Sequence, residues 1–91
     1  MFDFDFSEES RRELKSLSKK DKALANALSK KIKEICSRDS QTIEYYKNLR
    51  KPLNEFKRVH VGSFVLIFKV FKEKKLVYFD SFKHHDEAYK P

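Results

Sequence analysis

The stretch FKRVHVGSFVLIFKVF, from Phe56 to Phe71, decides the fold of this chain. Polar and apolar residues alternate over its first part, Lys57–Val61, which predicts a β-strand with one buried face. Gly62-Ser63 follows, and a glycine at the first central position of a two-residue loop favours a type II′ hairpin. The second part, Phe64–Phe71, is almost wholly apolar and predicts a central strand that is covered on much of both faces.

The residues around this hairpin predict a loop before it and one more strand after it. Asn48–Glu55 contains Pro52 and is expected to be a loop, and the polar segment 37–47 before it is compatible with one helical turn. Lys72–Lys75 is a charged turn, and Leu76–Phe82 is expected to be a further strand. Residues 83–91 are expected to be a polar tail.

The N-terminal part predicts a short strand and two helices. Phe2, Phe4 and Phe6 alternate with aspartates, and Ser7 is suited to cap a first helix over roughly 8–17. The segment Ser18–Asp21 has capping-box spacing and is expected to open the second helix. In that helix the apolar residues recur at intervals of three and four: Leu24, Ala27, Leu28, Ile32 and Ile35. Cys36, beside this stripe, is expected to be a small buried hydrophobe.

The expected order of elements is β-α-α-β-β-β, which is typical of the α+β class. We expect residues 1–91 to form a single domain, because a chain of 91 residues is too short for two. The short connection between the helices favours an antiparallel helical hairpin. This N-terminal hairpin is expected to pack on one face of a small, mainly antiparallel, twisted sheet, so that the other face is concave.

The charge of the chain is positive and unevenly distributed. The formal net charge is +7; residues 1–46 hold ten Lys/Arg and nine Asp/Glu, whereas residues 47–91 hold eleven and five. This bias favours a polyanionic partner such as nucleic acid. A lysine-rich face that only keeps the protein in solution has the same composition, so the charge alone leaves both interpretations open.

Composition and motifs exclude several classes of protein. A single cysteine excludes an internal disulfide and a thiolate zinc finger, and it suits a reducing, cytoplasmic location. No signal peptide is visible, and the longest apolar run, Phe64–Phe68, is far shorter than the roughly 20 residues of a membrane span. One glycine is too few for a phosphate-binding loop. No metal or other cofactor is expected, because the adjacent His84 and His85 point to opposite sides of an extended chain.

Cations, histidines and a tyrosine gather near the C-terminal strands. An antiparallel sheet brings residues that are distant in sequence together. A groove lined by Arg, Lys, His and Tyr suits stabilisation of a phosphorane-like transition state and proton transfer during attack of an RNA 2′-hydroxyl on the adjacent phosphate. The alternative is that Lys57, His60 and Lys83 are ordinary exposed strand residues.

Two segments carry a family signature. The first is LRKPLNEFKRVHVGSFVLIF, Leu49–Phe68, and the second is KHHDEAY, Lys83–Tyr89. Together they resemble the RelE/ParE superfamily of toxins from type II toxin–antitoxin systems, within its RelE-like branch of archaeal type. The order of elements expected above agrees with the β-α-α-β-β-β fold of that superfamily.

The resemblance implies a small cytoplasmic toxin that inhibits translation. RelE-like members enter the ribosomal A site and cleave mRNA there without a metal ion. The implied partner is an acidic RelB-like antitoxin, operator DNA is contacted only through the toxin–antitoxin complex, and no membrane contact is implied. The implied catalytic residues are Arg58, Lys83, His84, His85 and Tyr89. The implied RNA-binding residues are Arg50, Lys51, Lys57 and His60.

Two positions depart from the family pattern. Val65 stands where the superfamily usually has a phosphate-stabilising arginine, and His85 stands where its His-Arg motif has arginine. Loss of such a group typically costs about 2–4 kcal/mol of transition-state stabilisation. Either His85, Lys83 or Lys57 supplies the charge, or the activity is weak. Two alternatives therefore stay open: a ParE-like inhibitor of DNA gyrase that acts by protein contact, and a weakened toxin that acts mainly as an antitoxin-binding regulator.

Overall fold

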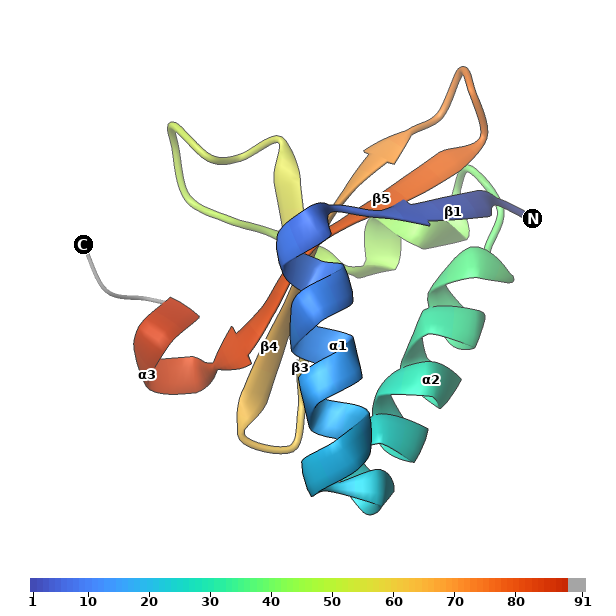
Figure 1. Ribbon diagram of the computed structural model, residues 1–91. Coiled ribbons are helices and arrows are strands. Elements are labelled where there is room, and N and C mark those ends of the chain that lie inside the picture. Colours follow the sequence, from blue (N-terminus) through green and yellow to red (C-terminus); the bar gives the residue numbers. More distant parts are fainter. Residues whose placement is uncertain (89–91) are drawn as a thin grey trace.

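The protein has the expected α+β architecture, here in a computed structural model that describes residues 1–88. Two helices pack on a five-stranded sheet, and a short third helix ends the described chain (Figure 1). In chain order the elements are β1 (Asp3–Phe6), α1 (Glu8–Lys20), α2 (Lys22–Cys36), the 3-10 turn η1 (Thr42–Tyr45), β2 (Lys47–Asn48), β3 (Phe56–Val61), β4 (Phe64–Phe71), β5 (Leu76–His84) and α3 (His85–Ala88).

The sheet has the strand order β1-β5-β4-β3-β2, with β4 at its centre. The pairs of β2, β3, β4 and β5 are antiparallel, whereas β1 runs parallel to β5. Gly62 has a φ of 60°, and the other positive φ angle among the described residues is at Lys75, not at Ser63. This geometry agrees with the predicted type II′ hairpin, in which the first central residue alone is left-handed.

One residue of β5 has no partner in β4. Ile67 is paired with Ser81, but the next residue, Phe68, is paired with Phe79, so Asp80 is a β-bulge. Side chains on a regular strand alternate between the two faces, and an extra residue restarts that alternation. As a result Phe79 and Phe82, three positions apart, both point to the core, where they are almost fully buried.

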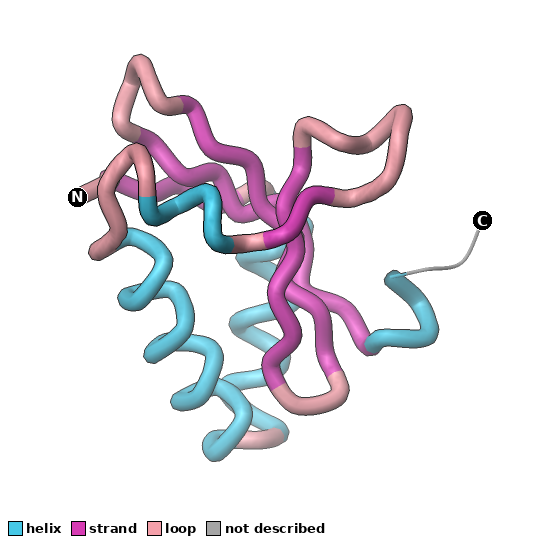
Figure 2. Tube along the Cα trace, turned by 180° about the vertical axis from the view of Figure 1, so that it is seen from behind, coloured by secondary structure: helices cyan, strands magenta, loops and turns pink. Residues whose placement is uncertain are grey.

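The helices cover one face of the sheet. α1 packs along β5 and α2 against β3, and the core between the layers includes Leu28 and Ile35 of α2 with Phe68 of β4. Figure 1 shows α3 on the other side of the strands from α1 and α2, and Figure 2 shows the same separation from behind. The opposite face is therefore left without a covering layer, apart from α3, over the described residues.

Two predicted boundaries are wrong. Ser18 does not open the second helix, because its hydroxyl donates back to the Lys15 carbonyl inside α1. Asp21 caps α2 instead: its carboxylate accepts the Leu24 N–H at 3.0 Å, and a charged acceptor is a strong cap for the positive end of a helix. The strand β5 also continues to His84, and α3 takes up residues 85–88 of the expected polar tail.

α1 closes the free edge of β5. β1 pairs only with Leu76–Phe79, so the rest of β5 has no strand on the edge away from β4. The Ser10 hydroxyl donates to the Phe79 carbonyl at 2.9 Å, and the Phe82 N–H donates to Glu13 Oε1 at 2.8 Å. Burial raises the pKa of Glu13 above its ordinary value, against the lowering effect of that N–H donor. Side chains of α1 thus replace a missing strand.

A buried lysine joins η1 and β2 to the sheet. The Lys57 side chain is only 8% exposed, and its ammonium lies 2.7 Å from Glu44 Oε1. It also donates to the Tyr46 carbonyl at 3.1 Å and to Asn48 Oδ1 at 2.7 Å. Hydrogen bonds from Lys57 and Lys72 hold the pKa of Glu44 below its ordinary value. Burial of this ammonium is tolerated because oxygen atoms surround it.

The substitution Glu44→Gln should lower the free energy of unfolding by about 1 kcal/mol at pH 7, a modest loss because Glu44 is half exposed. Since the folded pKa is depressed, the stabilisation is complete above the ordinary carboxyl pKa and disappears as the pH falls through the lowered value. Urea denaturation at pH 7 and pH 3 measures both effects. The exposed Glu73→Gln is the control, and an equal loss in both variants would contradict the role of Glu44.

Candidate functional site

The cross-strand register places several candidate residues on the face away from the helices. Lys83, Val65 and His60 are directly paired across β5, β4 and β3. Residues paired in this way project from the same face of a sheet. The adjacent row across β5, β4, β3 and β2 consists of Ser81, Ile67, Arg58 and Lys47. We call the face that carries these two rows the open face.

A pair of histidines lies at the end of the open face. The ring centroids of His60 and His85 are 5.5 Å apart, with the ring planes tilted by 30°. The His85 N–H donates to the Ser63 carbonyl at 2.8 Å, which ties the first residue of α3 to the β3–β4 turn. Half of the His85 side chain is exposed, and His60 is exposed as well. The two imidazoles are therefore adjacent and open to solvent.

The side chains of the adjacent residues His84 and His85 lie on different sides of the sheet. His84 ends β5 in the row of Phe64, and its ring stands edge-on to the Phe64 ring at 5.5 Å. It borders a hollow of about 420 Å³ beside α1, together with Arg12 and Glu13. His84 thus faces the helical side of the sheet, whereas His85 faces His60.

The remaining candidates are spread over both faces. Arg58 lies two residues before His60 on β3, so both side chains leave the open face. Lys83 Nζ lies 3.1 Å from Glu9 Oε1, and this contact raises the pKa of Lys83. Lys57 projects from the opposite face and is buried there, which argues against contact with RNA. Tyr89 lies outside the described residues.

The loop between β2 and β3 carries two exposed candidates, Arg50 and Lys51. Figures 1 and 2 agree that this loop projects on the same side of the sheet as α3. The row of Arg58 also holds a cation that the sequence did not single out: Lys47, which is exposed and paired with Arg58. Its signal is weak because β2 has only two residues, and so short a strand leaves no periodicity to detect.

Val65 occupies the place where the resemblance leads us to expect an arginine. Its side chain is 0% exposed, although it belongs to the open face between His60 and Lys83. Neighbouring side chains therefore cover it completely. The cations of the open face surround an apolar centre.

The described residues contain no set of three His, Cys, Asp or Glu side chains that could hold a metal ion. No helix in residues 1–88 is long and apolar enough to cross a bilayer. What the open face offers is cationic side chains and a pair of imidazoles, which can bind a phosphate and move protons without a metal ion.

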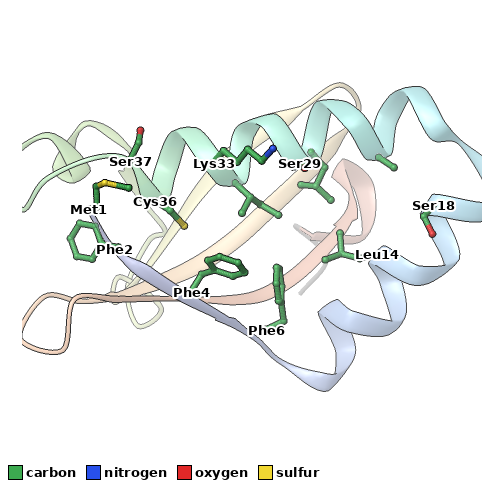
Figure 3. Close-up of a pocket in the computed structure, with 13 residues that line it drawn as sticks. Met1, Phe2, Phe4, Phe6, Leu14, Ser18, Ser29, Lys33, Cys36 and Ser37 are labelled. Atoms are coloured by element: carbon green, nitrogen blue, oxygen red, sulfur yellow. The ribbon is translucent and has the colours of Figure 1, made fainter.

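A second hollow, of about 580 Å³, lies between β1 and the two long helices (Figure 3). Phe4, Phe6 and Leu14 point into it, with Cys36 at one end. Burial raises the pKa of Cys36 to about 11, so its thiol stays protonated at neutral pH. This agrees with the expected role of Cys36 as a small buried hydrophobe. The groove provides apolar surface but no group for catalysis.

Comparison with known proteins gives relatives in two archaea. No family model matches the chain. It is 51% identical over 78 residues, 85% of this chain and 79% of the relative, to a Methanocaldococcus jannaschii protein with the provisional name toxin RelE4. It is 35% identical over 77 residues to an uncharacterized Methanosarcina mazei protein, covering 80% and 90% of the two chains.

Solved structures share the fold. The isolated E. coli RelE toxin superimposes with a TM-score of 0.74 at 23% identity, covering 97% of this chain and 95% of that chain. RelBE2, a toxin–antitoxin complex from Mycobacterium tuberculosis, contains a chain with a TM-score of 0.70 at 20% identity, covering 91% and 96%. At such identities the likeness shows the fold alone.

The substitution Val65→Arg should lower the free energy of unfolding by more than about 2 kcal/mol, because a guanidinium would replace a fully buried apolar side chain. His60→Arg is the matched control: it adds the same group at the exposed neighbour on the same face and should change stability by less than about 0.5 kcal/mol. Chemical denaturation measures both. Equal stability of Val65→Arg and the wild type would show that the site accommodates a cation after all.

Proposed function

The chain belongs to the RelE family of toxins from toxin–antitoxin systems, and from this premise we propose that it is an endoribonuclease that inhibits translation by cutting mRNA in the ribosomal A site. The observation that carries the proposal is the pair of adjacent, exposed imidazoles, His60 and His85, on the face that also presents Arg58. The loop with Arg50 and Lys51 projects on the same side and extends the cationic surface.

The proposed reaction is a transfer of the phosphodiester to the neighbouring 2′-oxygen. One imidazole takes the proton of the 2′-hydroxyl while the bond from O2′ to phosphorus forms. The bond from phosphorus to O5′ breaks, and the second imidazole gives its proton to O5′. The products are a 2′,3′-cyclic phosphate and a 5′-hydroxyl, so the step needs neither water nor a metal ion. Histidine suits both roles because it exchanges protons near neutral pH.

The charge of the pentacovalent transition state needs a cation. Arg58 is the best placed, because it lies two positions from His60 on the same face and a guanidinium binds two phosphate oxygens at once. Lys47 is paired with Arg58 across β2 and β3 and adds a second positive charge. These two residues take the role that the resemblance gives to an arginine at Val65. Lys83, held by Glu9, is a positioning cation at the margin of the site.

The proposed partner is an acidic RelB-like antitoxin. The fold neighbours include the toxin chains of E. coli RelBE and of Mycobacterium tuberculosis RelBE2, which were solved as complexes with antitoxins. The net charge of +7, concentrated in residues 47–91, suits a partner of opposite sign. Operator DNA would be reached only through this complex, and an activity on ribosomes places the toxin in the cytoplasm.

Cleavage should depend on His85 and not on His84. His60→Gln and His85→Gln should each reduce cleavage of ribosome-bound mRNA by about 10²-fold or more, because each removes a proton-transfer group. His84→Gln should reduce it less than tenfold, since His84 faces the helical side. Primer extension on mRNA from a cell-free translation reaction measures the cuts. Equal losses in His84→Gln and His85→Gln would overturn the assignment.

Two other outcomes would replace the proposal. Arrested DNA replication without cut mRNA would indicate a gyrase inhibitor. Absence of any growth defect when the protein is produced without its antitoxin would indicate a regulator that has lost the activity.

The affinity for the antitoxin should weaken by more than about tenfold when the salt concentration rises from about 0.05 to 0.5 M, because opposite charges at the interface are screened. Titration calorimetry of the purified pair at several salt concentrations measures this. An affinity that does not change with salt would show that apolar contacts, and not the positive charge of this chain, hold the antitoxin.

A further inference from the structure

The open face continues past the histidines along the strands. Beyond the row of Arg58, the next row consists of Phe56, Lys69 and Tyr78, paired across β3, β4 and β5. Phe71 follows two positions after Lys69 on β4 and therefore projects from the same face. We call Phe56, Lys69, Phe71 and Tyr78 the aromatic row. The bulge at Asp80 is what places Tyr78 on this face together with Lys83.

Rings and cations are interleaved in the aromatic row. Lys69 Nζ lies 5.0 Å from the centroid of the Phe71 ring and 5.9 Å from that of Phe56. Lys74, in the turn that follows, lies 5.8 Å from the Phe71 ring. Glu55 holds the Lys69 ammonium at 2.9 Å. The lysine is thus oriented across two rings.

The rings do not serve the core. All three aromatic residues are partly exposed, whereas the aromatic residues on the opposite face, Phe68 and Phe79, are 0% exposed. The only helix on the open face of the described chain is α3, which lies at the other end, beside the β3–β4 turn. Three neighbouring, partly exposed rings on a face without a covering layer offer a surface on which a ligand can stack.

We propose that the aromatic row binds the single-stranded RNA that extends from the cleavage site, with bases stacked on the rings and phosphates near Lys69 and Lys74. The inference rests on the proposed function, because it takes the RNA from His60 and Arg58 along β3 and β4. Stacking on aromatic side chains beside cations is how single-stranded nucleic acid is held without regard to sequence. Rows on one face repeat every two residues, about 6.7 Å, which gives successive nucleotides successive supports.

Charge favours RNA along this path. Asp3 and Asp5 lie at the β1 edge of the open face, where Asp5 is paired with Arg11 at 3.0 Å. Nearer the proposed path, Glu55 is paired with Lys69, and Asp86 lies 3.8 Å from His85. Strands β2 to β4 carry Lys47 and Arg58 in one row and Lys69 in the next. A phosphate backbone that follows β3 and β4 therefore meets cations in two successive rows, and the rings lie beside the second.

The test uses a probe that the protein does not cut. A fluorescein-labelled 2′-O-methyl octauridylate lacks the attacking hydroxyl, and a 2′-O-methyl trinucleotide is too short to reach both the histidines and the aromatic row. The full-length protein should bind the octamer at least tenfold more tightly than the trinucleotide. Phe71→Ala and Tyr78→Ala should each weaken octamer binding by about tenfold and leave trinucleotide binding unchanged. Fluorescence anisotropy at fixed salt measures both.

Phe4→Ala is the matched control. Phe4 is a phenylalanine that is 55% exposed on the helical side, so its loss should leave octamer binding unchanged. Thermal melts would show whether a variant is folded. A 4-thiouridine at one end of the octamer should cross-link to the wild-type protein at β4 or β5, near Phe71 or Tyr78, which requires no variant at all.

The outcomes separate this inference from the proposed function. The protein could bind the octamer in a way that depends on Phe71 and Tyr78 and yet cut no ribosome-bound mRNA. This result would support the RNA path along the aromatic row and reject the proposed nuclease activity. Equal binding of octamer and trinucleotide, with no effect of either substitution, would overturn the path even if mRNA is cut. Loss of antitoxin affinity in Phe71→Ala and Tyr78→Ala, with octamer binding intact, would assign the row to the antitoxin instead and likewise overturn it.

Discussion

The contact of α1 with the free edge of β5 is the constraint on which the rest of the molecule depends. β1 is too short to pair with all of β5, and the serine and glutamate side chains of α1 take over where β1 ends. This contact fixes the helical layer on one face and allows β5 to run on to His84. Because the strand ends there, His84 and His85 separate to opposite sides, and only His85 reaches His60.

Lys57 and Arg58 are adjacent on β3 but project from opposite faces of the sheet, so they have different roles. Lys57 projects from the same face as Val59 and Val61. Its ammonium is bound by oxygen atoms of Glu44, Tyr46 and Asn48, and these contacts hold η1 and β2 against the sheet. Arg58, the next residue, leaves the other face and stays with the candidate site. The positive charge of Lys57 therefore stabilises the fold, whereas that of Arg58 is available to the candidate site. Net charge is consequently a poor measure of how much cationic surface an anion can meet.

The sequence predicted those parts of the fold that depend on residues close together in the chain. The β3–β4 hairpin, its glycine turn and the amphipathic stripe of α2 follow from periodicity and from the left-handed conformation of Gly62. Long-range pairing did not follow: β1 runs parallel to β5, and β2 is only two residues long. The alternation in β3 already grouped Lys57 with the valines of the core face. Its oxygen partners, however, come from η1 and β2, which no short window of sequence connects to it.

The single unpaired residue of β5 has a consequence for how this chain can change. Asp80 interrupts the alternation of side chains along β5. Even-numbered residues before it and odd-numbered residues after it therefore project from the open face. Deletion of that one residue would leave Phe79 and Ser81 adjacent and on opposite faces, as in a regular strand, so His84 and His85 would keep their positions. Asp80 is thus a place in β5 where the chain can lose a residue without moving the C-terminal end of the site. A second extra residue in the strand would instead turn everything after it to the other face, unless a second bulge absorbed it.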